Sequence, residues 1–250
     1  HEMPDAEIPY YLEHGEATAV LTLGAHRTRL INVIASLTRS IPVITQDEIS
    51  TLKLADVPAI TETTTDSNSE CALLYTSGST GKPKGCLLNN DYFLQQGVWY
   101  QNLGGHIDLR EGRERLLTPL PLSHMNAMSV STLAMFMTGG CLIQLDRFHP
   151  GTWWQSLRES KATALHYLGV LPAILLALPE DTQDDFSTQI RFGFGAGVNQ
   201  AHHERFEKRF GFPLVEAWAM TECGAGGAII ANEDPRHVGH CCFGKPLPAV

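Results

Sequence analysis

Short apolar runs alternate along the chain with longer stretches in which apolar residues recur every three or four positions. After the first third of the chain, the short runs predict strands at residues 115–120, 140–145, 164–168, 190–194, 213–218 and 228–231. The longer stretches predict helices at residues 129–137, 150–162, 172–178 and 200–210. This alternation favours an α/β fold of mostly parallel sheets with crossover helices.

The N-terminal part shows the same alternation in shorter pieces, with helix and strand patterns at residues 10–14, 19–23, 27–37 and 41–44. Residues 61–70 contain no apolar side chain, which predicts a surface loop. A buried strand is predicted at residues 71–74 and a second strand at residues 85–88. Residues 89–91, Asn-Asn-Asp, supply capping side chains for a helix through about residue 101.

Residues 75–85, between these two strands, form the most informative segment of the chain. From Thr76 to Gly81 every residue is glycine, serine or threonine, and Lys82 and Lys84 follow. Glycine permits close backbone approach, hydroxyls and N–H groups bind oxygens, and lysines supply positive charge, as a polyphosphate requires. The alternative is an ordinary surface hairpin rich in serine and glycine.

This segment does not fit the Walker A pattern of P-loop proteins. That pattern requires Gly-x-x-x-x-Gly-Lys followed by serine or threonine. If Gly81 and Lys82 are aligned with it, the first glycine falls on Thr76 and the last position on Pro83. A P-loop kinase or NTPase is therefore disfavoured.

Composition limits the function classes further. The chain has 250 residues, and its 43% hydrophobic content is ample for a buried core. A net charge of −9 argues against non-specific nucleic-acid binding. No apolar run has membrane-spanning length and no signal segment opens the chain, so we expect a cytoplasmic protein without a membrane partner. The oligomeric state cannot be predicted.

The six cysteines show no Cys-x-x-Cys spacing. Residues 237–242, His-Val-Gly-His-Cys-Cys, contain several ligand types close together. Adjacent cysteines cannot easily face one ion, so a loop leading to a strand is favoured there over a zinc site.

Two segments follow predicted strands and place polar or small residues at the strand ends. Residues 119–126 include His124 at a turn, where an open α/β sheet binds ligands, although a lone histidine is more often structural. Residues 192–198 run from a strand into a glycine turn, but a Rossmann fingerprint would require glycine at Val198.

A third segment combines a hydroxyl and a carboxylate. Thr221 and Glu222 stand just past a predicted strand end, a position suited to binding a phosphate oxygen and Mg²⁺. The pair is a weak signal alone and a strong one together with the phosphate-type loop.

In this order the motifs resemble the adenylate-forming superfamily, which comprises acyl-CoA synthetases, luciferases and the adenylation domains of peptide synthetases. Residues 75–85 match its phosphate loop throughout, and residues 218–222 resemble its Tyr-Gly-x-Thr-Glu motif, with Trp218 and Ala219 as departures. Residues 244–248 resemble its Gly-x-Pro-x-Pro segment. Met220 favours the acyl-CoA synthetase branch, and the glycine turn together with residues 217–222 looks most like carnitine/crotonobetaine-CoA ligases.

The resemblance implies the core of the large N-terminal domain of such an enzyme, with ATP, Mg²⁺ and coenzyme A as cofactors and a small carboxylic acid as substrate. The implied nucleotide-binding residues are Thr76, Ser77, Gly78, Ser79, Thr80, Gly81, Lys82, Gly195, Ala196, Gly197, Trp218 and Met220. The implied catalytic residues are Lys84, His124, Thr221 and Glu222, and Glu222 would also hold Mg²⁺. An apolar cleft of His124, Val198 and Met220 would receive the acyl group.

The implied function is an ATP-dependent acyl-CoA ligase that activates a carboxylate as an acyl-adenylate and transfers it to coenzyme A. Residues 1–250 are expected to be a partial N-terminal AMP-binding domain, without its start and without the C-terminal domain. We therefore expect this chain alone to adenylate very poorly. A non-catalytic nucleotide-binding fragment and an adenylation domain that loads a carrier protein are the alternatives.

Overall fold

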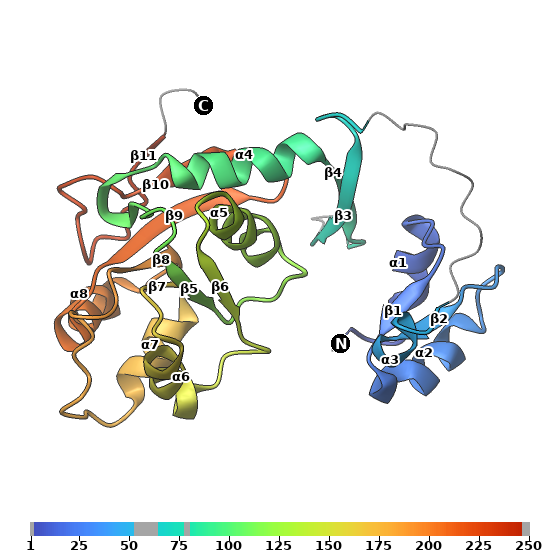
Figure 1. Cartoon of the computed structure of the whole chain (residues 1–250), viewed down its shortest axis with the longest axis horizontal. Coiled ribbons are helices and arrows are strands. Elements are labelled where there is room, and N and C mark those ends of the chain that lie inside the picture. The colour runs from blue at the N-terminus through green and yellow to red at the C-terminus, as the bar shows by residue number, and fades with distance from the viewer. Residues whose placement is uncertain (1–2, 53–64, 78–80, 247–250) are drawn as a thin grey trace. The chain divides into compact units, whose positions relative to one another are not determined.

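The computed structural model describes residues 3–52, 65–77 and 81–246, and the chain divides into two compact units, residues 1–65 and 66–250 (Figure 1). In the first unit, β1 (Val20–Thr22) and β2 (Val43–Thr45) pair in parallel. Three helices accompany them, α1 (Ile8–His14), α2 (Arg27–Ile34) and α3 (Gln46–Ile49). The predicted order is confirmed, but α3 was not predicted. It begins with a capping box between Thr45 and Glu48.

The second unit is built on a seven-stranded sheet in the order β11-β10-β9-β8-β7-β5-β6. Its strands are β5 (Arg115–Thr118), β6 (Cys141–Gln144), β7 (Ala164–Leu168), β8 (Phe192–Ala196), β9 (Leu214–Met220), β10 (Gly224–Ile230) and β11 (Lys245–Pro246). Five neighbouring strands run parallel to one another, in the order β9, β8, β7, β5 and β6. β10 pairs antiparallel with β9, and β11 pairs antiparallel with β10. The predicted α/β class is therefore confirmed.

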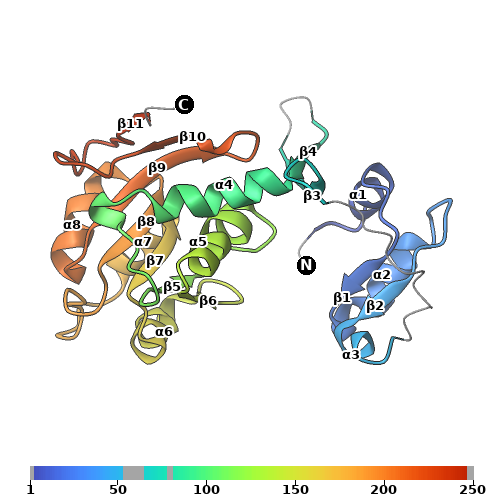
Figure 2. The ribbon, with the colours of Figure 1, turned by 45° about the horizontal axis from the view of Figure 1, so that its top comes forward.

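Helices cover both faces of this sheet (Figures 1 and 2). One face packs against α4 (Asn90–Gln101), the π-helical segment η3 (Asn126–Ser131) and α5 (Thr132–Met137). The other packs against α6 (Trp153–Ser160), α7 (Val170–Ala177) and α8 (Gln200–Phe210). Successive strand residues serve opposite faces, as Leu116 and Leu117 of β5 show by lying in separate core clusters.

A separate antiparallel hairpin, β3 (Glu70–Thr76) and β4 (Lys84–Asn89), carries the glycine-rich segment. Leu74 and Leu88 of the hairpin form a small core with Phe93 of α4. The strand predicted at residues 71–74 is confirmed, but its expected burial is wrong, since Leu74 is buried and Cys71 is exposed. A two-stranded hairpin buries one face only, which explains the difference.

The helix predicted at residues 129–137 begins three residues earlier, with η3. The Ser131 hydroxyl donates to the Asn126 carbonyl at 3.2 Å, and the Thr132 hydroxyl donates to the Ala127 carbonyl at 2.7 Å. These contacts accompany a π-turn, a feature frequent at functional sites. Within residues 3–52, 65–77 and 81–246, no helix has the length and apolar character needed to cross a membrane.

Candidate active site

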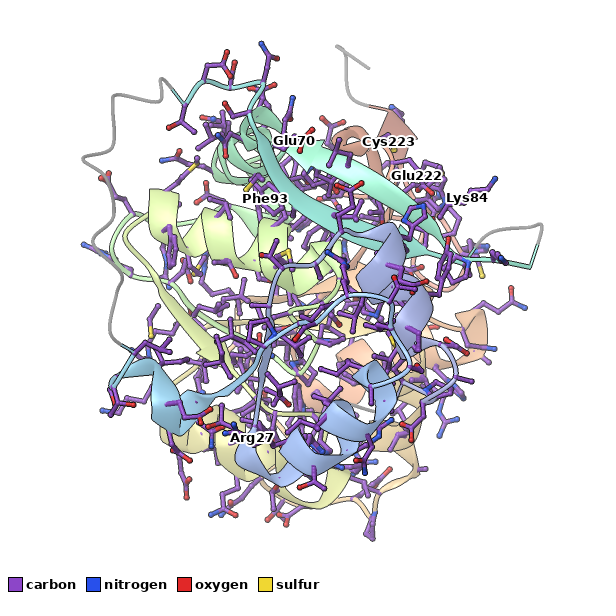
Figure 3. All side chains as sticks on the ribbon, turned by 90° about the vertical axis from the view of Figure 1, so that its right-hand side faces the viewer. Arg27, Glu70, Lys84, Phe93, Glu222 and Cys223 are labelled. Atoms are coloured by element: carbon purple, nitrogen blue, oxygen red, sulfur yellow. The ribbon has the colours of Figure 1, made fainter. Side chains whose placement is uncertain are left out.

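The glycine-rich hairpin and the Thr-Glu segment meet through a side-chain hydrogen bond. The Thr76 hydroxyl, at the end of β3, donates to Glu222 Oε1 at 3.1 Å, although 146 positions separate the two residues in the chain. Lys84 is the cross-strand partner of Thr76. Lys84 and Glu222 accordingly lie at the same edge of the unit (Figure 3). A cation, a hydroxyl and a carboxylate are thus brought together, with Thr221 adjacent.

The rest of the predicted phosphate loop is only partly described. Ser77, Gly81, Lys82 and Lys84 are exposed, and Gly81 has a φ of 96°, which favours glycine. Gly78, Ser79 and Thr80 lie outside the described residues. The described part is therefore open to a ligand.

The ends of β7 and β8 approach so closely that side chains have no space. A Cβ on Gly195 would lie 2.2 Å from the Tyr167 carbonyl oxygen. A Cβ on Gly169 would lie 1.9 Å from the carbonyl oxygen of Gly197, whose φ is 79°. The predicted small-residue turn of Gly195, Ala196 and Gly197 therefore carries no side chain larger than a methyl group at the strand ends.

Glu216 fastens this turn to β9. Its side chain is buried, and Oε1 accepts a hydrogen bond from the Val198 backbone N–H at 2.6 Å. Sequence reasoning gave Glu216 no role, although an acidic residue within an apolar strand pattern is a signal that it needs a partner. Val198 itself packs in the core beneath α7 and α8 instead of lining a cleft.

Strand alternation separates the residues of β9 between two faces. Trp218 and Met220 are 40% and 41% exposed and point to one face. Ala217 and Ala219 point to the other face, where they line a cavity of about 170 Å³. A planar group can thus stack on Trp218 while a second group occupies the cavity on the opposite side of the strand.

That cavity lies between the sheet and α4. Gln96 and Trp99, one helical turn apart on α4, form its wall together with Asn126 of η3. Gly195 and Ala196 line it at the end of β8. The cavity therefore reaches the same strand ends that carry the glycine turn.

A buried histidine holds Asn126 in place. His166 of β7 is fully buried, and burial lowers its pKa to about 3, so its ring is neutral. Its Nδ1 lies 2.9 Å from Asn126 Oδ1 and 2.7 Å from Ser131 Oγ, and its Nε2 lies 3.2 Å from the Tyr100 hydroxyl. Because an amide oxygen only accepts, Nδ1–H donates to Asn126 and Nε2 accepts from Tyr100.

The structure does not bring His124 to the cavity. His124 is exposed and precedes η3, where its backbone carbonyl accepts from the Met128 N–H at 3.0 Å. Its neighbour Asn126 lines the cavity instead. The predicted segment therefore contributes to the cavity, and the role of His124 itself stays a prediction. Gln96, Trp99 and His166 were missed, although the spacing of Gln96 and Trp99 places them on one helix face.

Among the described residues, no group of three or more histidine, cysteine or acidic side chains is arranged to hold a metal ion. Residues 237–242 form turns that lead to β11, and His237 and Cys241 have positive φ.

Curated relatives of this chain include acid–CoA ligases and fatty acid transport proteins. A sulfoacetate–CoA ligase of Cupriavidus necator is 28% identical over 230 residues, which cover 88% of this chain and 43% of that protein. Human long-chain fatty acid transport protein 3 is 27% identical over 153 residues, covering 61% of this chain and 22% of that protein. The chain thus spans less than half the length of either relative.

Solved structures share the fold. An o-succinylbenzoate coenzyme A synthetase from Bacillus subtilis, in complex with AMP, superposes with a TM-score of 0.75 at 23% identity, covering 98% of this chain and 59% of that one. The N-terminal domain of FACL13 from Mycobacterium tuberculosis gives a TM-score of 0.77 at 21% identity, covering 98% of this chain and 61% of that one.

The family comparison agrees with the resemblance that the order of motifs indicates. Residues 1–250 match the AMP-binding enzyme family over their whole length. The chain therefore belongs to the AMP-binding enzyme family, within the adenylate-forming superfamily.

Proposed function

We propose that this chain carries the nucleotide- and acyl-binding part of an AMP-forming acid–CoA ligase. In that reaction a carboxylate oxygen attacks the α-phosphorus of ATP, pyrophosphate leaves, and the acyl group passes from the adenylate to the thiol of coenzyme A. The supporting observation is the hydrogen bond between Thr76 and Glu222, which unites the two motifs that such chemistry requires. Two anions must be brought together, so positioning and charge neutralisation supply most of the catalysis.

The residues present suit ATP. Exposed Lys82 and Lys84 supply positive charge for the β- and γ-phosphates, with Ser77 and Gly81 beside them. Thr221 would contact the α-phosphate. The ring of Trp218, 40% exposed near the end of β9, offers a flat surface on which the adenine base would stack.

The Glu222 carboxylate would hold Mg²⁺, a cation that prefers oxygen ligands such as this exposed carboxylate. When bound, the ion would neutralise phosphate charge. The Thr76 hydroxyl orients the carboxylate by donating to its Oε1.

The substrate would be a small carboxylic acid. The relatives act, by their names, on different acids, one of which, sulfoacetate, carries a second anionic group. Among the described residues that line the cavity beside β9, none is charged, which disfavours a second anion in the acyl group. Coenzyme A is the proposed acceptor, and a carrier-protein thiol is the alternative.

A test of this function is ATP–pyrophosphate exchange by the full-length protein with a panel of carboxylic acids. We expect at least one acid to support exchange, and Glu222→Gln to lower kcat by about 100-fold, in the range found when one preorganised electrostatic contact is removed. Glu70→Gln, at the exposed start of β3, is the matched control and should leave exchange unchanged. Thioester formation with coenzyme A alone would then identify the acceptor.

Two results would contradict the proposal at different levels. If no acid supports exchange, the proposed ligase function is wrong. Exchange that persists at wild-type rate in Glu222→Gln would leave the function standing but reject the assigned site.

A further inference from the structure

We propose that the cavity between α4 and the sheet selects a short acyl chain that carries a hydrogen-bond acceptor, such as a keto or hydroxyl oxygen, toward its far end. The proposal rests on the ligase function above, because it describes the tail of the carboxylic acid that the ligase would activate. It is carried by the volume of the cavity and by the fixed orientation of Asn126.

The cavity is small and its walls are supported from behind. Its volume is about 170 Å³. A cavity of roughly 150 Å³ holds one benzene molecule, so about six non-hydrogen atoms fit here. Phe194 in the wall is 4% exposed and is backed by Tyr100 and His166, with ring centroids 5.2 Å away in both cases. A long alkyl chain would have to displace these buried rings.

Asn126 gives the cavity a hydrogen-bond donor. Its Oδ1 accepts a hydrogen bond from His166 Nδ1–H at 2.9 Å. The Asn126 amide NH₂ therefore remains as a donor on a side chain that lines the cavity. A keto or hydroxyl oxygen of the ligand is the complementary group.

Charge in the acyl tail would be unfavourable. None of the described lining residues is acidic or basic, so an anionic or cationic tail would lose water without gaining an ion pair. The Trp99 ring could still attract a quaternary ammonium group through its π-face, which makes such an acid the sharpest competitor in a test.

The position of the cavity agrees with an acyl site. Ala219 lines it two residues before Thr221, and Ala196 lines it at the end of β8. A carboxylate at these strand ends would lie beside the residues assigned to the nucleotide, with its tail directed toward α4. Gln96 and Trp99 then limit the length of the tail.

The first experiment compares acids in pyrophosphate exchange by the full-length protein. We expect kcat/KM for 4-oxopentanoate to exceed that for pentanoate roughly three- to tenfold, the value of one hydrogen bond. Octanoate should be poorer than pentanoate, and palmitate should give no exchange. A preference for palmitate, for a dicarboxylate or for a quaternary ammonium acid would overturn the proposal.

The second experiment replaces the hydrogen-bond donor of Asn126 with an acceptor. Asn126→Asp keeps an oxygen for His166 but replaces the NH₂ group with an acceptor. We expect the preference for 4-oxopentanoate over pentanoate to disappear and 5-aminopentanoate to become a substrate. Asn68→Asp, which adds the same charge at an exposed position, is the control. An unchanged acid preference in Asn126→Asp would contradict the role of the amide.

A third variant tests size separately and does not depend on Asn126. Trp99→Leu enlarges the cavity and should shift the preferred acid to a longer chain, whereas Val98→Ala, on the exposed side of α4, should not. If no acid supports exchange in the wild-type protein, the ligase function fails and this proposal with it. If exchange occurs but favours long or charged tails, only this proposal fails.

Discussion

At the residue scale, backbone crowding at the ends of β7 and β8 determines which side chains are tolerated. The nearest obstacle to a Cβ on Gly195 is the Tyr167 carbonyl oxygen, 2.2 Å away, which belongs to the neighbouring strand and cannot rotate aside. The alanine methyl group would therefore push β7 and β8 apart where the proposed nucleotide and acyl sites meet.

We predict that Gly195→Ala lowers the free energy of unfolding by roughly 1–3 kcal/mol, the usual cost of overpacking, and also reduces pyrophosphate exchange. Gly151→Ala is the control, because nothing lies within 4 Å of its Cβ position and its φ is not positive. Urea unfolding followed by circular dichroism measures the difference. Equal stability of the two variants would show that the strand ends move apart freely.

At the scale of the elements, α4 links the hairpin to the cavity. Its N-cap is Asn89, whose side-chain oxygen accepts from the Tyr92 N–H at 2.9 Å. Ten residues further along, Trp99 lines the cavity. The Asn89 cap therefore stabilises the helix that supplies Trp99 to the cavity.

Two caps provide a matched comparison. Asn89→Ala and Asn199→Ala each remove a side-chain cap, the latter from α8 on the other face of the sheet. Each should lower the free energy of unfolding by about 1 kcal/mol. Only Asn89→Ala should change the preference of the enzyme among acids of different length. A similar change in both variants would point to global loosening.

At the scale of the whole molecule, acid should destabilise the second unit through His166 and Glu207, whose pH ranges differ. Burial lowers the pKa of His166 to about 3. The unfolded chain binds a proton there below about pH 6.5 and the folded chain does not, so stability falls with pH from that value toward 3. Although burial raises the pKa of Glu207, hydrogen bonds from Arg236 and His203 lower it to about 2. The stability that Glu207 contributes is lost below its ordinary pKa, as pH falls toward 2.

Between pH 6 and pH 5, the free energy of unfolding should therefore fall because of His166, while Glu207 contributes almost nothing to the change. We predict that the free energy of unfolding falls by about 1 kcal/mol more over this interval in the wild-type protein than in His166→Gln, which cannot titrate. Urea titrations at both pH values measure the difference. Parallel losses in the two proteins would mean that the ring is protonated in the folded state.

Much of the second unit could be predicted from local pattern. The strand at Ala164–Leu168 and the helix at Gln200–Phe210 have the predicted bounds, because each is a clear apolar run or a clear amphipathic period with a cap. The start of the helix at Asn126 could not be predicted, because a π-turn depends on contacts between Ser131, Asn126 and the buried His166.

The candidate site divides in the same way. The glycine-rich segment and Thr221-Glu222 could be recognised from sequence, because their chemistry resides in consecutive residues. The cavity could not, because Trp99, Asn126 and Ala217 come from three elements and meet only when α4 and η3 pack on the sheet. The segment that contains His124 reaches the cavity through Asn126, and the role of His124 stays a prediction.

The sequence by itself determined the class of the fold, the family and the phosphate-type motif, because periodicity and contiguous motifs are local properties of the chain. Tertiary structure decided that Thr76 meets Glu222 across 146 positions, that Gly195 has no space for a side chain, and that a small neutral cavity lies opposite Trp218. Those features arise from packing between distant segments, whose distances and free volumes no local pattern specifies.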